Sequence, residues 1–97
     1  LVNRPPSAPP GNLARFYGPN EDCTFTPTVS DPDGNSDTVE NPHSSSPDVF
    51  VTMVDATTIS CTVAAAPATG NVTISYTVVD SFGDSVTGRT TVPVVGI

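Results

Sequence analysis

Strict alternation of apolar and polar side chains over residues 71–79 constrains the fold of this chain more than any other feature. Val72, Ile74, Tyr76 and Val78 are separated by single Thr and Ser residues. Successive side chains on a β-strand point to opposite faces, so this period of two predicts a strand with one face in a core. Val and Thr favour strands, and the good helix formers Lys, Glu and Gln are almost absent, which predicts almost no α-helix.

Other segments show strand patterns between turn signals. The clearest candidates occupy residues 23–30, 48–54, 58–64 and 85–95, and two weaker ones occupy residues 13–17 and 38–40. The remainder of residues 35–48 is polar and is expected to form a long loop. Turns are predicted at residues 18–20, 31–34, 55–57 and 80–84. Six or seven short strands at this spacing predict an all-β, immunoglobulin-like Greek-key β-sandwich of about seven strands.

A proline-rich stretch opens the sequence. Residues 1–12 contain four prolines, which lack an amide hydrogen and have a fixed φ. We therefore expect residues 1–12 to be an extended linker and residues 13–97 to be a single β-sandwich domain. A chain of 97 residues suits one small domain with a modest core.

Cys23 and Cys61 are the only cysteines in the chain. With His43 as the only histidine, they are too few for a structural zinc site, and they lack the CxxC redox spacing. Both lie on the inward phase of their predicted strands, so a disulfide between them is predicted. It would close a loop of about 38 residues and stabilise the fold by roughly 3–4 kcal/mol. The alternative is a pair of buried free thiols.

The charge of the chain excludes several kinds of partner. Ten acidic residues against three arginines give a net charge of −7, which disfavours nucleic acid and anionic lipid surfaces. No apolar run approaches the length of a membrane span, about 20 residues, so no membrane insertion is expected. The acidity and the disulfide favour a secreted, extracellular or cell-surface protein.

Three motifs in order resemble the tandem cadherin-like and bacterial immunoglobulin-like repeats of surface proteins. They are Asn3-Arg4-Pro5-Pro6, Val29-Ser30-Asp31-Pro32-Asp33-Gly34-Asn35 and Ile74-Ser75-Tyr76-Thr77-Val78-Val79-Asp80-Ser81-Phe82-Gly83. The resemblance implies one domain of a rod, with neighbouring domains of the same chain as partners. It implies a spacer or cell-adhesion function.

The same resemblance implies a calcium site at the junction with the preceding domain. By position, its ligands are Asp31, Asp33 and Asp80, and Asp84 and Asn35 lie in the same loops. The family's acidic motif before the sixth strand is replaced here by Ala64-Ala65-Ala66-Pro67-Ala68. In the alternative interpretation the three aspartates only shape turns. Residues 31–42 do not form an EF-hand, because Ser36 and Pro42 occupy the positions that require Gly and Glu.

Catalysis is not expected. His43 precedes three serines, but nothing nearby fixes a base against a rigid nucleophile, and no Gly-x-Ser-x-Gly elbow exists. Of the aromatic residues, Phe25 and Tyr76 are expected to face the core, which leaves Phe16, Tyr17 and Phe82 as candidates for exposed positions.

Two other functions stay open. One is a protein- or carbohydrate-binding module that recognises its partner through its loops, with residues 35–48 as the variable loop. The other is a decoration domain of a capsid or appendage, or a fibronectin-type domain beside an enzyme. Asn71-Val72-Thr73 matches the N-glycosylation acceptor, so Asn71 is a candidate glycosylation site.

Overall fold

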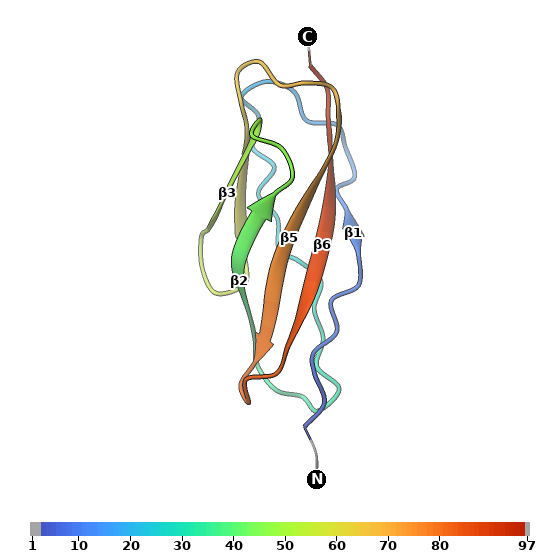
Figure 1. Ribbon diagram of the computed structural model, residues 1–97, viewed down its shortest axis with the longest axis vertical. Helices are drawn as coiled ribbons and strands as arrows, with labels where there is room; N and C mark the ends of the chain where they lie inside the picture. The colour runs from blue at the N-terminus through green and yellow to red at the C-terminus, as the bar shows by residue number, and fades with distance from the viewer. Residues whose placement is uncertain (1–2, 97) are drawn as a thin grey trace.

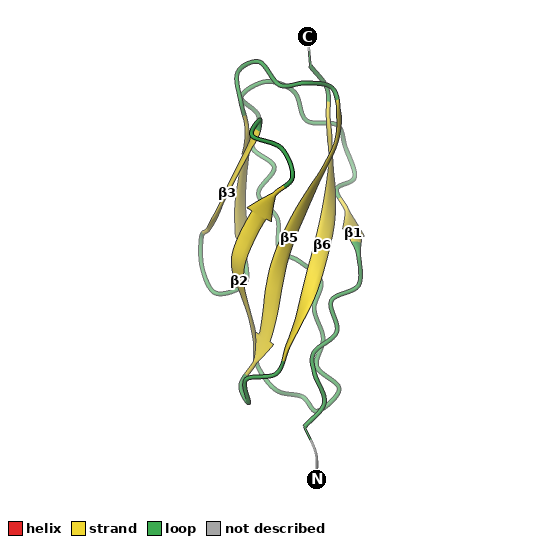
Figure 2. Ribbon diagram, in the orientation of Figure 1, coloured by secondary structure: helices red, strands yellow, loops and turns green. Residues whose placement is uncertain are grey.

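The computed structural model describes residues 3–96, which contain strands and no helix (Figures 1 and 2). The strands are β1 (Gly11–Asn12), β2 (Asp37–Ser44), β3 (Val49–Met53), β4 (Ile59–Val63), β5 (Gly70–Asp80) and β6 (Ser85–Val94). The prediction of an all-β chain is therefore confirmed for the described residues.

The strands form two sheets. One sheet has the order β1-β6-β5-β2, and the other contains β3 and β4. β1 runs parallel to β6, whereas β6 with β5, β5 with β2 and β3 with β4 are antiparallel. Isolated bridges extend the smaller sheet: Asp22 pairs with Thr62, Phe25 with Ile59, and Ser7 with Ser30. The result is a two-layer arrangement compatible with a β-sandwich.

The β5–β6 hairpin is the backbone of the larger sheet. Val72 pairs with Val92, Ile74 with Thr90 and Tyr76 with Gly88. Apart from the half-buried Val86, the inward side chains of both strands are buried, and the outward ones are half-buried or exposed, as the sequence period predicts. A Cβ at residue 88 would overlap the Tyr76 ring, so glycine makes room for the aromatic side chain.

The core lies between the two sheets and takes residues from both. Its buried apolar members are Cys23, Val39, Val49, Ile59, Cys61, Val63, Val72, Ile74, Tyr76, Val78, Val92 and Val94. Phe25 packs against Tyr76, with 6.4 Å between the ring centroids, and the Tyr76 hydroxyl forms a 2.8 Å hydrogen bond with Thr90 Oγ1. This bond satisfies the polar tip of a side chain that is 2% exposed.

The predicted disulfide between Cys23 and Cys61 is present, with a Cα–Cα distance of 4.7 Å. The two residues lie opposite each other in adjacent extended segments, and the Cys23 amide donates to the Cys61 carbonyl at 2.8 Å. The disulfide therefore joins neighbours within one layer and does not cross between the sheets.

Three details of the strand prediction are wrong. Residues 23–30 form no continuous strand, and only the bridges of Phe25 with Ile59 and of Ser30 with Ser7 pair them, because Pro27 lacks an amide hydrogen for a ladder. β2 continues to Ser44, well beyond residues 38–40, because a register shift between Glu40 and His43 accommodates Pro42, which cannot donate to the ladder. Asn41 has a φ of 53° at this bulge. Residues 13–17 form no continuous strand, and their pairing is a bridge between Tyr17 and Val94.

Residues 3–12 lie along the folded body. Pro6 is buried, and Ser7 and Ser30 exchange two backbone hydrogen bonds of 2.7 and 2.9 Å. β1 then adds to the edge of β6. Whether residues 13–97 fold without residues 1–12 stays a prediction, and residues 1 and 2 lie outside the described part of the chain.

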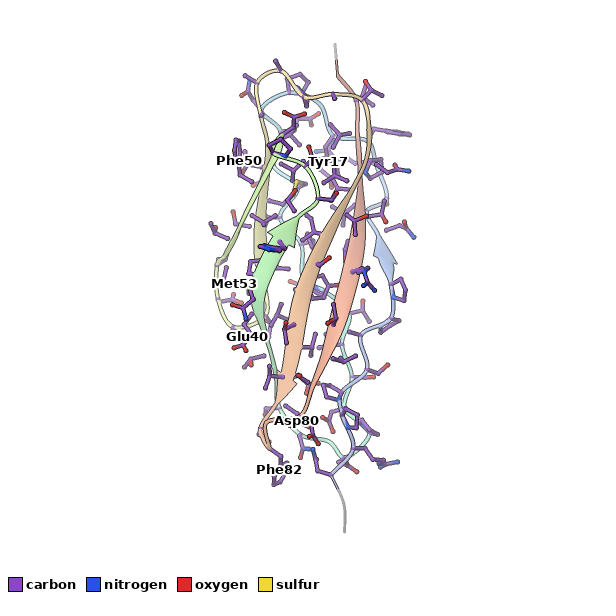
Figure 3. The ribbon with its side chains drawn as sticks, in the orientation of Figure 1. Tyr17, Glu40, Phe50, Met53, Asp80 and Phe82 are labelled. Carbon is purple, nitrogen blue, oxygen red and sulfur yellow. A yellow bond between two sulfur atoms is a disulfide. The ribbon has the colours of Figure 1, made fainter. Side chains whose placement is uncertain are left out.

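The molecule is elongated, with extents of 54 × 19 × 17 Å. The described chain begins at one end of the long axis and finishes at the other (Figure 1). Asp80 and Phe82 lie near the end where the chain begins, and Tyr17 and Phe50 lie toward the opposite end (Figure 3).

Candidate functional site

Polar side chains gather at the end of the sandwich where the chain begins. The turn before β2 carries Asp31, Asp33 and Asn35, and the turn from β5 to β6 spans Asp80 and Asp84. We call this set, with Asn3, Arg4 and Asp37, the acidic end. Each turn is closed by a backbone bond, from Gly34 N to Asp31 O and from Gly83 N to Asp80 O. A shared site at the junction with a preceding domain requires both turns to lie at one end near the N-terminus, and Asn3 contacts both of them there.

Asn3 connects the two turns of the acidic end through hydrogen bonds. Its Nδ2 donates to Asp80 Oδ2 at 2.7 Å and to Asp84 Oδ2 at 2.6 Å, and its Oδ1 accepts from Asn35 Nδ2 at 2.6 Å. Asp80 Oδ1 accepts the amides of Phe82 and Asp84 at 2.9 and 3.0 Å. The bond from Asn3, followed by the backbone amides, lowers the pKa of Asp80 despite its burial.

Arg4 binds the turn before β2. The Arg4 amide donates to Asp33 Oδ2 at 2.6 Å, and its guanidinium donates to Asp33 Oδ1 and to the Pro32 carbonyl. These hydrogen bonds lower the pKa of Asp33. Because the pair is exposed, its contribution to stability is small, and its main effect is to direct the chain against the turn.

Asp37 is the carboxylate of the acidic end whose charge is least favoured by its surroundings. Burial, and then the charge of Asp31, raises the pKa of Asp37, and Asp80 adds to the effect. Asp31 Oδ2 and Asp37 Oδ1 are both buried without a hydrogen-bond partner among the described residues. A carboxyl proton on Asp37 would relieve the repulsion between them.

The three aspartates predicted to bind calcium are only partly brought together. Asp31 and Asp80 both lie near Asp37, whereas the Asp33 carboxylate turns to Arg4. Within residues 3–96, no three His, Cys, Asp or Glu side chains are grouped as they would be around a metal ion. As arranged, the aspartates do not fit a calcium ion, and calcium binding stays a prediction.

Three of these roles are not evident from the sequence. Asn3 and Arg4 lie in the predicted linker, and Asp37 belongs to no motif. The Asp-x-Asp spacing was a detectable signal for the turn itself, since Asp31 Oδ1 accepts the Asp33 amide at 2.8 Å. No local signal identifies Asn3 as the partner of Asp80, because 77 positions separate them.

The serines after His43 bond to the backbone. Ser44 Oγ donates to the Ser46 carbonyl at 2.8 Å, and Ser45 Oγ accepts the Thr73 amide at 2.9 Å. His43 is exposed at the edge of the larger sheet. Asn71, the candidate glycosylation site, is exposed at the beginning of β5, and its modification stays a prediction.

Exposed aromatic residues are scattered. Phe16, Phe50 and Phe82 are 67%, 59% and 71% exposed, whereas Tyr17 is half-buried beneath the Arg15 guanidinium. Phe50 and Phe82 lie in different regions of the molecule (Figure 3). The labelled aromatics do not form a single stacking platform.

Comparisons with known proteins identify the fold alone. Neither the family models nor the curated proteins gave a match to this sequence. A nucleoside hydrolase-related hypothetical protein from Saccharophagus degradans, associated with carbohydrate metabolism, aligns with a TM-score of 0.68 and 16% identity. The alignment covers 97% of this chain and 26% of that protein. An endo-fucoidan hydrolase of glycoside hydrolase family 107 also aligns at 0.68 and 16% identity, over 95% of this chain and 14% of the hydrolase.

This chain therefore spans about a quarter of the length of the nucleoside hydrolase-related protein and about a seventh of the length of the fucoidan hydrolase. No segment of residues 3–96 forms a helix with the length and apolarity that a membrane crossing requires.

Proposed function

We propose that this chain is a non-catalytic, immunoglobulin-like module that acts as a spacer or adhesion unit within a larger secreted or cell-surface protein. The observation that carries the proposal is the shape. The long axis of 54 Å has the two ends of the described chain at its opposite ends (Figure 1). Modules with this arrangement extend a polypeptide when they are joined in series.

The strand connections support the immunoglobulin-like assignment. A constant-type immunoglobulin domain has seven strands, four in one sheet and three in the other. Here β2, β5 and β6 represent the three-stranded sheet. The segments around Ser7 and Phe25, followed by β4 and β3, pair in the order expected of the four-stranded sheet. β1 crosses to the other sheet and pairs in parallel with β6.

Three features make such a spacer stiff. The disulfide joins the segment at Cys23 to β4, the β5–β6 hairpin spans most of the sheet, and Asn3 and Arg4 hold the beginning of the chain to both end turns. The disulfide also favours an oxidising compartment, in agreement with a secreted protein. The two similar structures contain this fold as a minor part, which suits a module attached to other domains.

Calcium at the acidic end belongs to this proposal as a separate hypothesis. Asp33 would have to leave Arg4 to join a common site with Asp31 and Asp80. The melting temperature in millimolar calcium and in excess chelator, for the wild type and Asp31→Asn/Asp33→Asn, tests it. A rise with calcium that the double variant loses would support calcium binding. Equal melting temperatures would mean that Asn3 and Arg4 hold the acidic end without calcium.

Single-molecule energy transfer tests the spacer function. Dyes on flanking domains at both ends should report a narrow distribution of distances. A flexible linker of the same residue count would have a similar mean separation, about 50–60 Å, but a broad distribution. The width is therefore the decisive quantity. A broad distribution under conditions where circular dichroism shows a folded domain would overturn the spacer proposal.

A binding module is the second candidate function. The specific observation in its favour is an open groove of about 520 Å³ beside the bulge of β2. Because β2 occupies residues 37–44, recognition would use the face of a sheet more than a variable loop.

A further inference from the structure

The sheet of β2, β5 and β6 has an outer face, formed by the side chains that point away from the core. Its register places residues from three strands in straight rows. His43 pairs with Ser75, which pairs with Arg89 on the other side. The neighbouring row is Glu40, Thr77 and Thr87.

The bulge of β2 makes this face hollow. The groove beside it is lined by residues 41–43 of β2, by residues 75–77 of β5 and by Thr87 of β6. The positive φ of Asn41, 53°, accompanies the register shift that brings His43 opposite Ser75. Hydroxyl, amide and imidazole groups therefore border one open groove.

The distribution of charge singles out this face. Arg4 and Arg15 form ion pairs with Asp33 and Glu21, whereas Arg89 is exposed and has no ion pair or side-chain hydrogen bond with any residue from 3 to 96. Of the ten acidic residues in the chain, Glu40 alone belongs to the rows of the outer face. A chain with a net charge of −7 thus presents Arg89, without an ion pair in residues 3–96, in the same row as its only histidine.

We propose that the outer face binds an acidic polysaccharide, with one carboxylate or sulfate group between Arg89 and His43. Two strand spacings separate their backbones by roughly 9–10 Å, which leaves room for one such group above Ser75. The planar guanidinium donates two parallel hydrogen bonds to an oxyanion of this kind. Sugar hydroxyls then contact Ser75, Thr77 and Thr87.

The open form of the groove, beside an exposed arginine, favours a hydrated charged polymer over other ligands. Small-molecule sites enclose most of the surface of their ligand, and the centres of protein interfaces are rich in aromatic residues. The outer side chains of these strands are mainly Thr and Ser, without an aromatic residue. The proposal does not depend on the spacer function, which concerns the ends of the molecule.

Isothermal titration of the full chain at low salt tests the proposal. The probes are polygalacturonate, which carries carboxylates, dextran sulfate, which carries sulfate esters, and neutral dextran. We expect binding to one or both acidic polymers and none to dextran. Arg89→Gln should weaken the affinity about tenfold, the usual effect of removing a charged hydrogen-bond donor.

Arg15→Gln is the matched control, because it removes the same charge from an exposed arginine that lies outside the rows of this face. It should change the affinity less than twofold. Arg89→Lys, which keeps the charge without the planar fork, should bind between the wild type and Arg89→Gln. Circular dichroism verifies that each variant is folded.

Three results would overturn the proposal: no binding to either acidic polymer, equal binding to dextran, or equal losses in Arg89→Gln and Arg15→Gln. The two acidic probes distinguish a carboxylate from a sulfate ligand. A failed titration would leave the spacer proposal intact, and a broad distance distribution would leave this proposal intact.

Discussion

The inner and outer faces of β5 and β6 come from the same two strands but differ in burial and in hydrogen bonding. On the inner face, Tyr76 is 2% exposed, its ring lies against Gly88, and its hydroxyl bonds to Thr90. On the outer face, Ser75 and Arg89 occupy the next positions and have no side-chain hydrogen bond within residues 3–96. The inner face therefore carries stability, and the outer face is free to carry recognition.

The acidic end continues the inner face to the end of the sheet. Asp80 follows Val78 on the same side of β5 and is 5% exposed. Asn3 and two backbone amides satisfy its carboxylate. The buried carboxylate is tolerated because it has hydrogen-bond partners. Removing one of these partners should lower the free energy of unfolding more than removing the partner of an exposed group.

The largest effect is expected from a charge on the inner face. Tyr76→Asp should abolish cooperative unfolding, since an unpaired buried carboxylate costs more than about 4 kcal/mol, comparable with the stability of a small domain. Thermal melting followed by circular dichroism measures this. Tyr76→Phe, which loses only the bond to Thr90, should remain folded. A cooperative transition in Tyr76→Asp would mean that the inner and outer faces are reversed.

A smaller loss is expected at Gly88. The added methyl group of Gly88→Ala overlaps the Tyr76 ring and should destabilise the domain by about 1–3 kcal/mol in urea unfolding. In Tyr76→Leu/Gly88→Ala the shorter side chain leaves space for the methyl group. The double variant should therefore lose less than the sum of the two single variants. Strict additivity would argue against the close contact.

The acidic end should make stability depend on pH in two opposite ways. The pKa values of Asp80 and Asp33 are lowered in the folded state, so their stabilisation is present above the ordinary aspartate range and is lost as pH falls through the folded pKa. The raised pKa of Asp37 acts in reverse, so its protonation stabilises the fold as pH falls toward the aspartate range. Maximum stability is therefore expected at mildly acidic pH.

Asn3→Ala isolates the first of these effects. It should lower the melting temperature by several degrees at pH 7 and by less at strongly acidic pH, because protonation of Asp80 weakens the bond that it accepts from Asn3. Asn71→Ala is the control, because Asn71 is exposed at the other end of β5. Equal losses for Asn3→Ala at both pH values would show that the bond to Asp80 does not lower its pKa.

The smallest effect is expected on the outer face. Ser75→Ala and Thr87→Val should each change the free energy of unfolding by less than about 0.5 kcal/mol, because neither side chain forms a hydrogen bond within residues 3–96. Urea unfolding measures both. A loss above 1 kcal/mol in either would mean that the outer face contributes to stability, and the contrast between the two faces would disappear.

The core strands were predictable and the acidic end was only partly so. The periods over residues 71–79 and 85–95 identified the buried side chains of β5 and β6, and Cys23 and Cys61 were correctly paired. The extension of β2 past Pro42 was missed, since a proline in a polar stretch is typical of a loop. Its bulge became visible only where β2 pairs with β5.

By itself, the sequence determined which side of each main strand is buried. That property follows from the alternation of side chains along an extended backbone, which depends on neighbours two positions apart. The tertiary structure alone decided that Asn3 meets Asp80 and Asp84, and that His43, Ser75 and Arg89 form one row. These contacts join distant segments, and their geometry depends on how the sheets pack and on the register of paired strands, which no local pattern encodes.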